Sequence, residues 1–130
     1  MSTAGPPEGD RYAGPPAFAL EALPAPDGVL LIRLEGELDV ATTPRFRAEV
    51  QRATGAGTRA VVLDMEAVVF MDSSMLKELL RTRGQLTPRG GVIVLAAVQE
   101  PVRRLLDLTR TSELLALVPT REEALARASG

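Results

Sequence analysis

The hydrophobic positions of this chain form two kinds of pattern that alternate along its length. Short runs of aliphatic residues bounded by glycine, proline or aspartate are typical of strands. Apolar residues three and four positions apart are typical of amphipathic helices. Strands are predicted at residues 17–22, 29–34, 60–65, 92–96 and 114–118. Helices are predicted at residues 43–55, 73–85, a short stretch from 101 onward, and 120–128.

The order of these elements, β-β-α-β-α-β-α-β-α, predicts an α/β fold. Strands separated by helices pair in parallel through right-handed crossovers, whereas the first two strands, joined at the turn-rich segment 24–28, form an antiparallel hairpin. We expect one domain at residues 17–130, with a mixed, mostly parallel sheet of four to five strands and about four helices. Residues 1–16 contain four prolines and three glycines and are expected to form a disordered tail.

Local signals predict where helices begin and where loops lie. Thr43 is expected to cap the first helix, with Pro44 at the first helical position. Thr120 begins a Thr-x-x-Glu capping box at the last helix. Residues 36–41 and the segment between Met65 and Ser73 are expected to be loops.

Composition excludes several kinds of chemistry. The chain has no Cys and no His, which excludes thiol nucleophiles, Ser-His-Asp triads and metal sites built on these residues, so no metal or cofactor is expected. Its 15 basic and 17 acidic side chains nearly balance, which disfavours direct nucleic-acid binding. No apolar run approaches the ~20 residues that span a bilayer, and the first residues do not resemble a secretory signal. A cytoplasmic protein is expected.

Three neighbouring oxygen-bearing side chains, Asp72, Ser73 and Ser74, precede or begin the second predicted helix. One interpretation is a simple helix cap, which Asp and Ser both favour. However, a cap needs only one residue. These three also follow the apolar pair at 70–71, at the carboxyl end of a predicted parallel strand. Ligands and partners usually bind α/β sheets at that end. A phosphate on a serine at a helix N-terminus would be tolerated by the helix dipole. The segment is therefore a candidate switch.

A second acidic segment, Gly36-Glu37-Leu38-Asp39, also follows a predicted strand. It is equally consistent with a turn in which Asp39 binds its own backbone and with an acidic loop beside the serine site. The sequence leaves both interpretations open.

Several short segments at these intervals together resemble a STAS domain of the anti-sigma factor antagonist (anti-anti-sigma factor) type. The segments are Gly36–Asp39, Val61–Asp64, Phe70–Ser74, Val92–Leu95, Leu114–Leu115 and Glu122–Leu125. The resemblance covers residues 17–128, and Asp-Ser-Ser is its most specific element.

The resemblance implies partner switching. In that family the unphosphorylated antagonist binds an anti-sigma factor, often a serine kinase of the ATPase fold, and thereby frees a sigma factor for transcription, for example in a stress response. Phosphorylation of a serine breaks the complex, and a PP2C-type phosphatase restores it. By position, the phosphorylation site is Ser74, and the partner-binding residues are Asp39, Asp72, Ser73, Ser74 and Met75. A monomer or weak dimer without enzymatic activity is expected.

One position departs from the family pattern. Asp-Ser-Ser is usually followed by Gly and Leu, whereas Met75 and Leu76 follow here. Met75 belongs either to the apolar stripe of the helix or to the partner surface, where methionine suits adaptable contacts. Lys77, about one turn beyond Ser74, is a cation that can pair with a phosphate.

Two other functions are compatible with parts of the sequence. A STAS protein that is not phosphorylated would serve as a scaffold or binding subunit, in a stress-signalling complex or a lipid-transport ATPase. A small α/β enzyme using Asp72 and Ser74 is disfavoured, because the chain has no His, no Cys, no phosphate-binding glycine motif and no G-x-S-x-G elbow. Asp64 and Glu66 are interpreted as strand-end residues.

Overall fold

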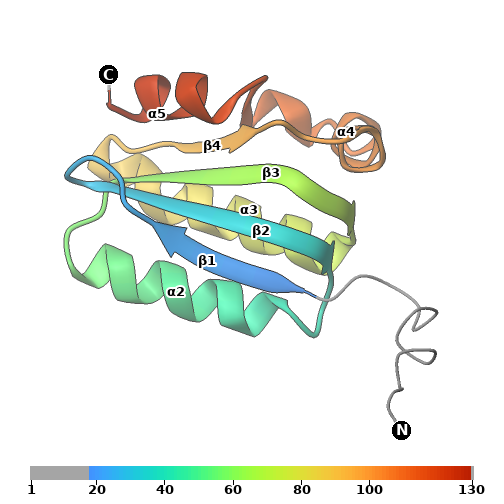
Figure 1. Ribbon diagram of the computed structural model, residues 1–130, viewed down its shortest axis with the longest axis horizontal. Coiled ribbons are helices and arrows are strands. Elements are labelled where there is room, and N and C mark those ends of the chain that lie inside the picture. Colours follow the sequence, from blue (N-terminus) through green and yellow to red (C-terminus); the bar gives the residue numbers. More distant parts are fainter. Residues whose placement is uncertain (1–17, 130) are drawn as a thin grey trace, which may run out of the picture.

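The computed structural model describes residues 18–129, and the tail expected at residues 1–16 lies outside them (Figure 1). Within the described residues, strands and helices follow one another in the predicted order, with two short 3-10 helices inserted. The strands are β1 (Ala19–Leu23), β2 (Val29–Leu38), β3 (Ala60–Met71), β4 (Ile93–Ala96) and β5 (Ala116–Val118). The helices are α2 (Thr43–Gly55), α3 (Ser73–Leu86), η1 (Thr87–Arg89), α4 (Glu100–Leu108), η2 (Thr111–Glu113) and α5 (Arg121–Ser129).

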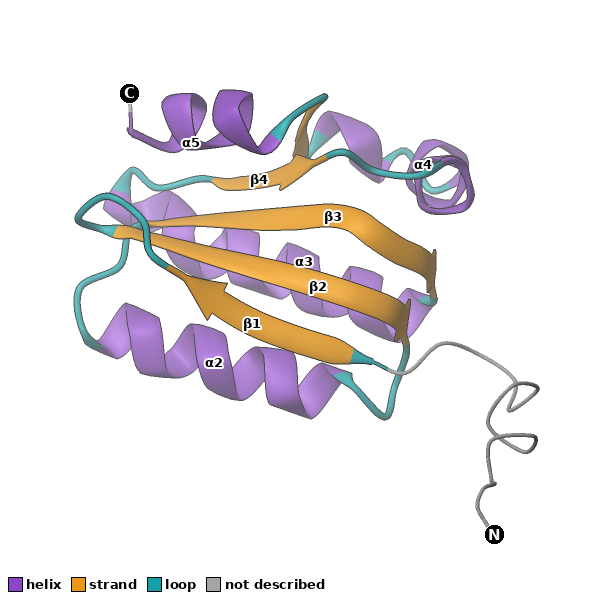
Figure 2. Ribbon diagram, in the orientation of Figure 1, coloured by secondary structure: helices purple, strands orange, loops and turns teal. Residues whose placement is uncertain are grey.

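The five strands form one sheet in the order β1-β2-β3-β4-β5 (Figure 2). The two longest strands, β2 and β3, are paired with each other. β1 pairs antiparallel with β2, and the other three pairs are parallel. The predicted hairpin and the mostly parallel α/β sheet are therefore confirmed.

Alternating strand residues divide the core into two apolar clusters, one on each face of the sheet. Ile32 and Leu63 belong to the larger cluster, together with buried side chains of α2, α3 and α4. Leu31 and Val62, their chain neighbours, belong to the smaller cluster with α5. Figure 1 shows α2 and α3 along one side of the sheet and α5 along the other. The fold is a sheet between two helical layers.

β2 and β3 are longer than their apolar runs predict, so the two expected loops are partly strand. β2 continues to Leu38, and β3 continues to Met71. Both strands remain paired to their ends, where Leu38 lies opposite Met71. The predictions of loops at 36–41 and from Met65 to Ser73 were wrong for these residues.

Irregular pairing explains why the pattern hides these strand extensions. The β2–β3 register shifts twice between Arg33 and Glu37, and Gly36 adopts a positive φ of 90°. Strand irregularities of this kind break the alternation of inward and outward residues. Consecutive Val69 and Phe70 are consequently both partly exposed, at 37% and 45%.

The helix starts follow the predictions with one shift. α2 begins at Thr43, and Thr42 takes the N-cap position, so the predicted cap was wrong by one residue. Thr42 makes no side-chain cap bond to the helix. At α5, the Thr120 hydroxyl oxygen accepts the backbone N–H of Glu123 at 3.1 Å, as expected for the Thr half of a capping box.

The last strand is shorter than predicted, because residues 114–115 lie outside β5. They follow the 3-10 helix η2, and Leu115 is buried while Leu114 is 46% exposed. A short apolar run therefore indicates that a strand is present better than it fixes where the strand begins.

Candidate functional site

The pairing of β2 with β3 brings the two candidate acidic segments together. Leu38 and Met71 are opposite each other at the carboxyl ends of these strands. The backbone N–H of Asp72 donates to the carbonyl oxygen of Leu38 at 3.0 Å. Asp39 and Asp72 therefore leave neighbouring strands at the same edge of the sheet, beside the start of α3.

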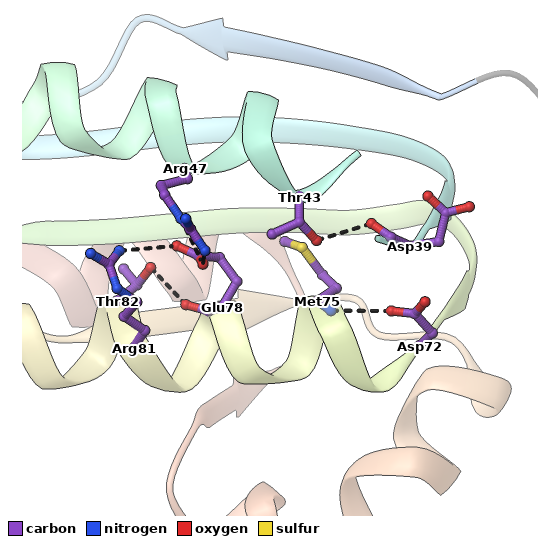
Figure 3. Close-up of polar contacts among 8 residues, drawn as sticks. All are labelled: Asp39, Thr43, Arg47, Asp72, Met75, Glu78, Arg81 and Thr82. Carbon is purple, nitrogen blue, oxygen red and sulfur yellow. Dashed lines mark hydrogen bonds and ion pairs between the residues drawn. The ribbon is translucent and has the colours of Figure 1, made fainter. Parts of the chain in front are cut away.

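Asp72 is the N-cap of α3, as Figure 3 shows for its bond to Met75. Its Oδ1 accepts the backbone N–H groups of Ser74 and Met75, at 2.9 and 3.1 Å. These N–H groups have no acceptor within the helix, so the carboxylate satisfies both. The cap interpretation is correct for Asp72. Since Asp72 caps the helix, the hydroxyl groups of the two serines are not needed as caps.

Asp39 organises the loop between β2 and α2. Its Oδ1 accepts the N–H groups of Ala41 at 3.0 Å and Thr42 at 3.2 Å. Its backbone carbonyl accepts the hydroxyl groups of Thr42, at 3.0 Å, and of Thr43, at 2.9 Å, the bond that Figure 3 shows. The turn interpretation is therefore correct for Asp39, whereas residues 36–38 belong to β2. The same loop exposes Val40, whose side chain is 68% accessible.

The residues at the start of α3 differ in exposure. Ser73 is exposed, whereas Ser74 is half-buried. Met75 is only 1% exposed and belongs to the larger core cluster. The core interpretation of Met75 is therefore correct, and its side chain is not on the surface that a partner would meet.

Ser74 lines a hollow between α2 and α3 with a volume of about 330 Å³. The other lining residues are Val40, Thr43, Pro44, Arg47, Lys77, Glu78 and Arg81. The hollow thus joins the serine, the exposed apolar residue of the Asp39 loop and a group of charged side chains.

A buried carboxylate holds the two arginine side chains of the hollow in place. Glu78 is 3% exposed, and its Oε1 accepts from Arg47 Nε at 3.1 Å and Nη2 at 2.8 Å (Figure 3). Arg81 Nη1 lies 3.5 Å from the other carboxylate oxygen. The hydrogen bond from Arg47 to Glu78, reinforced by their opposite charges, raises the pKa of the Arg47 guanidinium. Arg47 therefore stays protonated in this site.

A second hollow, of about 280 Å³, lies beyond the carboxyl ends of β4 and β5 and beside the middle of β3. Asp64 and Glu66 line it from within β3, so their interpretation as strand-end residues was wrong. Asp64 Oδ2 accepts from Arg121 Nε and Nη2 at 3.0 and 2.9 Å, and its Oδ1 accepts the backbone N–H of Glu66 at 3.1 Å. These bonds join β3 to α5 and give Asp64 a structural role. Within residues 18–129, no group of three or more potential acidic, His or Cys ligands is arranged to hold a metal ion.

The fold and this edge define a small α/β domain in which an Asp-capped helix start presents two serines beside a cationic hollow. The chain belongs to the STAS domain family, whose model matches residues 22–124. Among the helices of the described residues, none has the length and apolar character needed to cross a membrane.

Known relatives agree with this assignment. The chain is 32% identical over 99 residues to an anti-sigma F factor antagonist of Paenibacillus polymyxa, a match that covers 75% of this chain and 85% of the relative. It is 27% identical to an anti-sigma factor antagonist structure from Mycobacterium paratuberculosis, with a TM-score of 0.77 and coverage of 88% and 96%. It is also 27% identical to the Bacillus cell fate determinant SpoIIAA in its phosphorylated form, with a TM-score of 0.65 and coverage of 85% and 98%.

The sequence interpretation missed most of the hollow. It noted Lys77 but not Arg47, Glu78, Arg81 or Val40. One signal was present, because Lys77, Glu78 and Arg81 follow Ser74 at spacings of three, four and seven, which place them on one helix face. No local signal points to Arg47, which comes from α2.

Proposed function

We propose that this chain is an anti-sigma factor antagonist, which binds an anti-sigma factor through the edge formed by the β2–α2 loop and the start of α3. The observation that carries the proposal is the position of Ser74. It stands in the first turn of an Asp-capped helix, half-buried beside an exposed loop, in a chain similar to named antagonists. Asp39, Asp72, Ser73 and Ser74 are the proposed contact residues, together with Val40.

The proposed partner is an anti-sigma factor that is also an ATPase-fold serine kinase. Ser74 Oγ would take the γ-phosphoryl group of ATP, with release of ADP and of the hydroxyl proton. A PP2C-type phosphatase would transfer that phosphoryl group to water, which regenerates the serine and releases inorganic phosphate. Modification would thereby alternate the chain between a bound and a released state, in the cytoplasm where transcription takes place.

The local chemistry supports such a switch. Phosphorylation adds about −1.5 to −2 charges near neutral pH. In the unbound chain, the dipole at the N-terminus of α3 offsets part of the added charge, beside the Asp72 carboxylate that already caps the helix. A close interface would instead have to desolvate the phosphate near the carboxylates of Asp39 and Asp72. A loss of ~3 kcal/mol of binding free energy would weaken the complex more than a hundredfold.

The buried position of Met75 favours Ser74 as an acceptor. A methionine in place of the usual glycine would hinder a kinase if its side chain covered the serine. Its side chain instead packs in the core, so it does not compete with Ser74 for the exposed face. The scaffold alternative, in which Ser74 is not modified, is an outcome of the following test.

A capture experiment in the native host tests the proposal. Wild-type chain, Ser74→Ala and Ser74→Asp are used as bait, and bound proteins are identified by mass spectrometry. Gln85→Glu is the matched control, because it adds one negative charge at an exposed position of the same helix, away from the proposed contact residues. Recovery of an ATPase-fold kinase by wild type and Ser74→Ala, with at least tenfold less on Ser74→Asp than on Gln85→Glu, is the expected result. Equal recovery by all four baits would favour the scaffold function.

A further inference from the structure

The hollow beside Ser74 is formed by two facing helix surfaces. Ser74, Lys77, Glu78 and Arg81 lie on one face of α3, since residues three, four and seven apart are stacked along a helix. Pro44 and Arg47 face them from α2, three residues apart in that helix.

Positive charge exceeds negative charge in this hollow. Three cationic side chains line it, Arg47, Lys77 and Arg81, and Glu78 is its one lining carboxylate. Glu78 is 3% exposed, whereas the side chains of Arg47 and Arg81 remain about half exposed, at 47% and 45%. The carboxylate therefore orients the two arginines, and each guanidinium has N–H donors that Glu78 does not use.

Ser74 lines the same hollow as the three cations and is one helical turn from Lys77, whereas Ser73 does not line the hollow. Side chains one turn apart on a helix are about 5–6 Å apart at their β-carbons, and Lys77 is three residues beyond Ser74. Ser73 is exposed and does not line the hollow. Two adjacent serines thus share the helix N-terminus but differ in their access to the cations.

We infer that the Arg47, Lys77 and Arg81 side chains form a receptor for a phosphoryl group on Ser74 of the same chain. The inference rests on the proposed function in taking Ser74 as the modified residue. A phosphoserine has three acceptor oxygens, and charge-assisted bonds to Lys and Arg are the strong ones that it makes in proteins. Modification then places a phosphoryl group in the hollow and neutralises its excess positive charge, which changes the surface available to a partner beside Val40.

Other charged groups lie near the same space and also act on a phosphate there. Glu78 opposes an anion from below, and Asp72 and Asp39 lie at the adjoining end of α3 and in the β2–α2 loop. The α3 N-terminus favours an anion on either serine. A comparison of the two phosphoserines therefore separates the effect of the hollow from that of the helix.

The test needs no kinase. Full-length chain is made with phosphoserine inserted during translation at position 74 or at position 73, and the phosphate is titrated by ³¹P NMR. The second pKa of an unperturbed phosphoserine is about 6. We expect the pKa at position 74 to be lower than at position 73 by about 0.5–1 unit, the effect of nearby cations at partly exposed positions.

Single charge removals identify the groups responsible. Lys77→Gln and Arg81→Gln should each raise the phosphoserine-74 pKa, and Arg47→Gln should do the same if its fold is intact by circular dichroism. Lys77→Gln alters an exposed side chain, so it keeps the test valid if an arginine variant unfolds. Arg83→Gln is the matched control on the same helix, because Arg83 lines a different hollow, and it should leave the pKa unchanged.

The receptor is contradicted if the two phosphoserines titrate alike, or if Arg83→Gln has the same effect as Lys77→Gln. The proposed function is judged separately by capturing partners on the phosphoserine-74 chain. A lowered pKa without loss of the partner would support the receptor and refute the switch. An ordinary pKa with loss of the partner would refute the receptor and leave the switch in place.

Discussion

Asp72 and Ser74 are joined by a hydrogen bond of 2.9 Å from the Ser74 backbone N–H to the Asp72 carboxylate. The residue that precedes the two serines thus fixes the backbone of the proposed phosphorylation site. Its second bond, to the N–H of Met75, anchors the first turn of α3 over the core. The Asp72 side chain therefore fixes the backbone position from which the Ser74 side chain projects.

Removing this cap should destabilise the protein. Asp72→Ala leaves two helix N–H groups without their carboxylate acceptor, and we expect the free energy of unfolding to fall by about 0.5–2 kcal/mol. Asp72→Ser, which retains a capping oxygen, should recover most of the loss. Urea denaturation measures both variants. Identical stabilities of Asp72→Ala and wild type would show that the cap contributes nothing.

The buried face of α3 should be sensitive to truncation. Leu79 is fully buried in the larger cluster, so Leu79→Ala removes packed atoms and leaves a cavity. The expected loss is about 2–5 kcal/mol, seen as a lower urea midpoint. Lys77→Ala, on the exposed face of the same helix, is the control and should change stability by less than about 0.5 kcal/mol. An unchanged midpoint for Leu79→Ala would contradict the packing of this helix against the sheet.

Two glycines should respond in opposite ways to alanine. A β-carbon on Gly91 would lie 1.6 Å from the carbonyl oxygen of Arg59, which neither backbone can avoid, whereas one on Gly84 meets nothing within 4 Å. Gly91→Ala should therefore abolish or severely reduce folding. Gly84→Ala, in the interior of α3, should stabilise by about 0.5–1 kcal/mol. Thermal unfolding by circular dichroism distinguishes them, and a well-folded Gly91→Ala protein would contradict the close approach of these segments.

The ion pair between Asp64 and Arg121 should stabilise the packing of α5. The Asp64 side chain is 8% exposed and Arg121 is 37% exposed, so Arg121→Ala leaves a nearly buried carboxylate with only its backbone N–H donor. We expect a loss of about 1–3 kcal/mol. Arg127→Ala, an exposed change in the same helix, is the control. Equal small effects of both changes would mean that solvent replaces the missing guanidinium.

The Arg47–Glu78 pair should be insensitive to alkaline pH. Because its partner raises the pKa of Arg47, the stabilisation from this guanidinium is complete below its unfolded pKa and is lost only as pH rises through the raised folded value. The melting temperature of Arg47→Gln should therefore lie below that of wild type by a constant interval from pH 7 to 10. A difference that vanishes within this range would show that the pair does not hold the hollow together.

The sequence by itself determined the elements and most of their order. Alternation and helical spacing depend on side chains a few residues apart, so the hairpin, the parallel strands and the apolar face of α3 could be predicted locally. The same is true of the Asp72 cap and of the alternatives weighed for Met75. Strand ends were less accessible to prediction, because the irregularities near Gly36 interrupt the alternation on which a strand is recognised.

Only the tertiary structure decided how distant segments meet. The opposition of Leu38 and Met71 brings the Asp39 loop beside the serines, and the packing of α2 on α3 brings Arg47 to Glu78, 31 residues away. These contacts depend on sheet register and helix packing, which arise from the sum of many apolar contacts. The sequence spacing of the residues that meet therefore does not reveal them. The candidate switch serine could therefore be found in the sequence, whereas the cationic hollow beside it exists only in the folded chain.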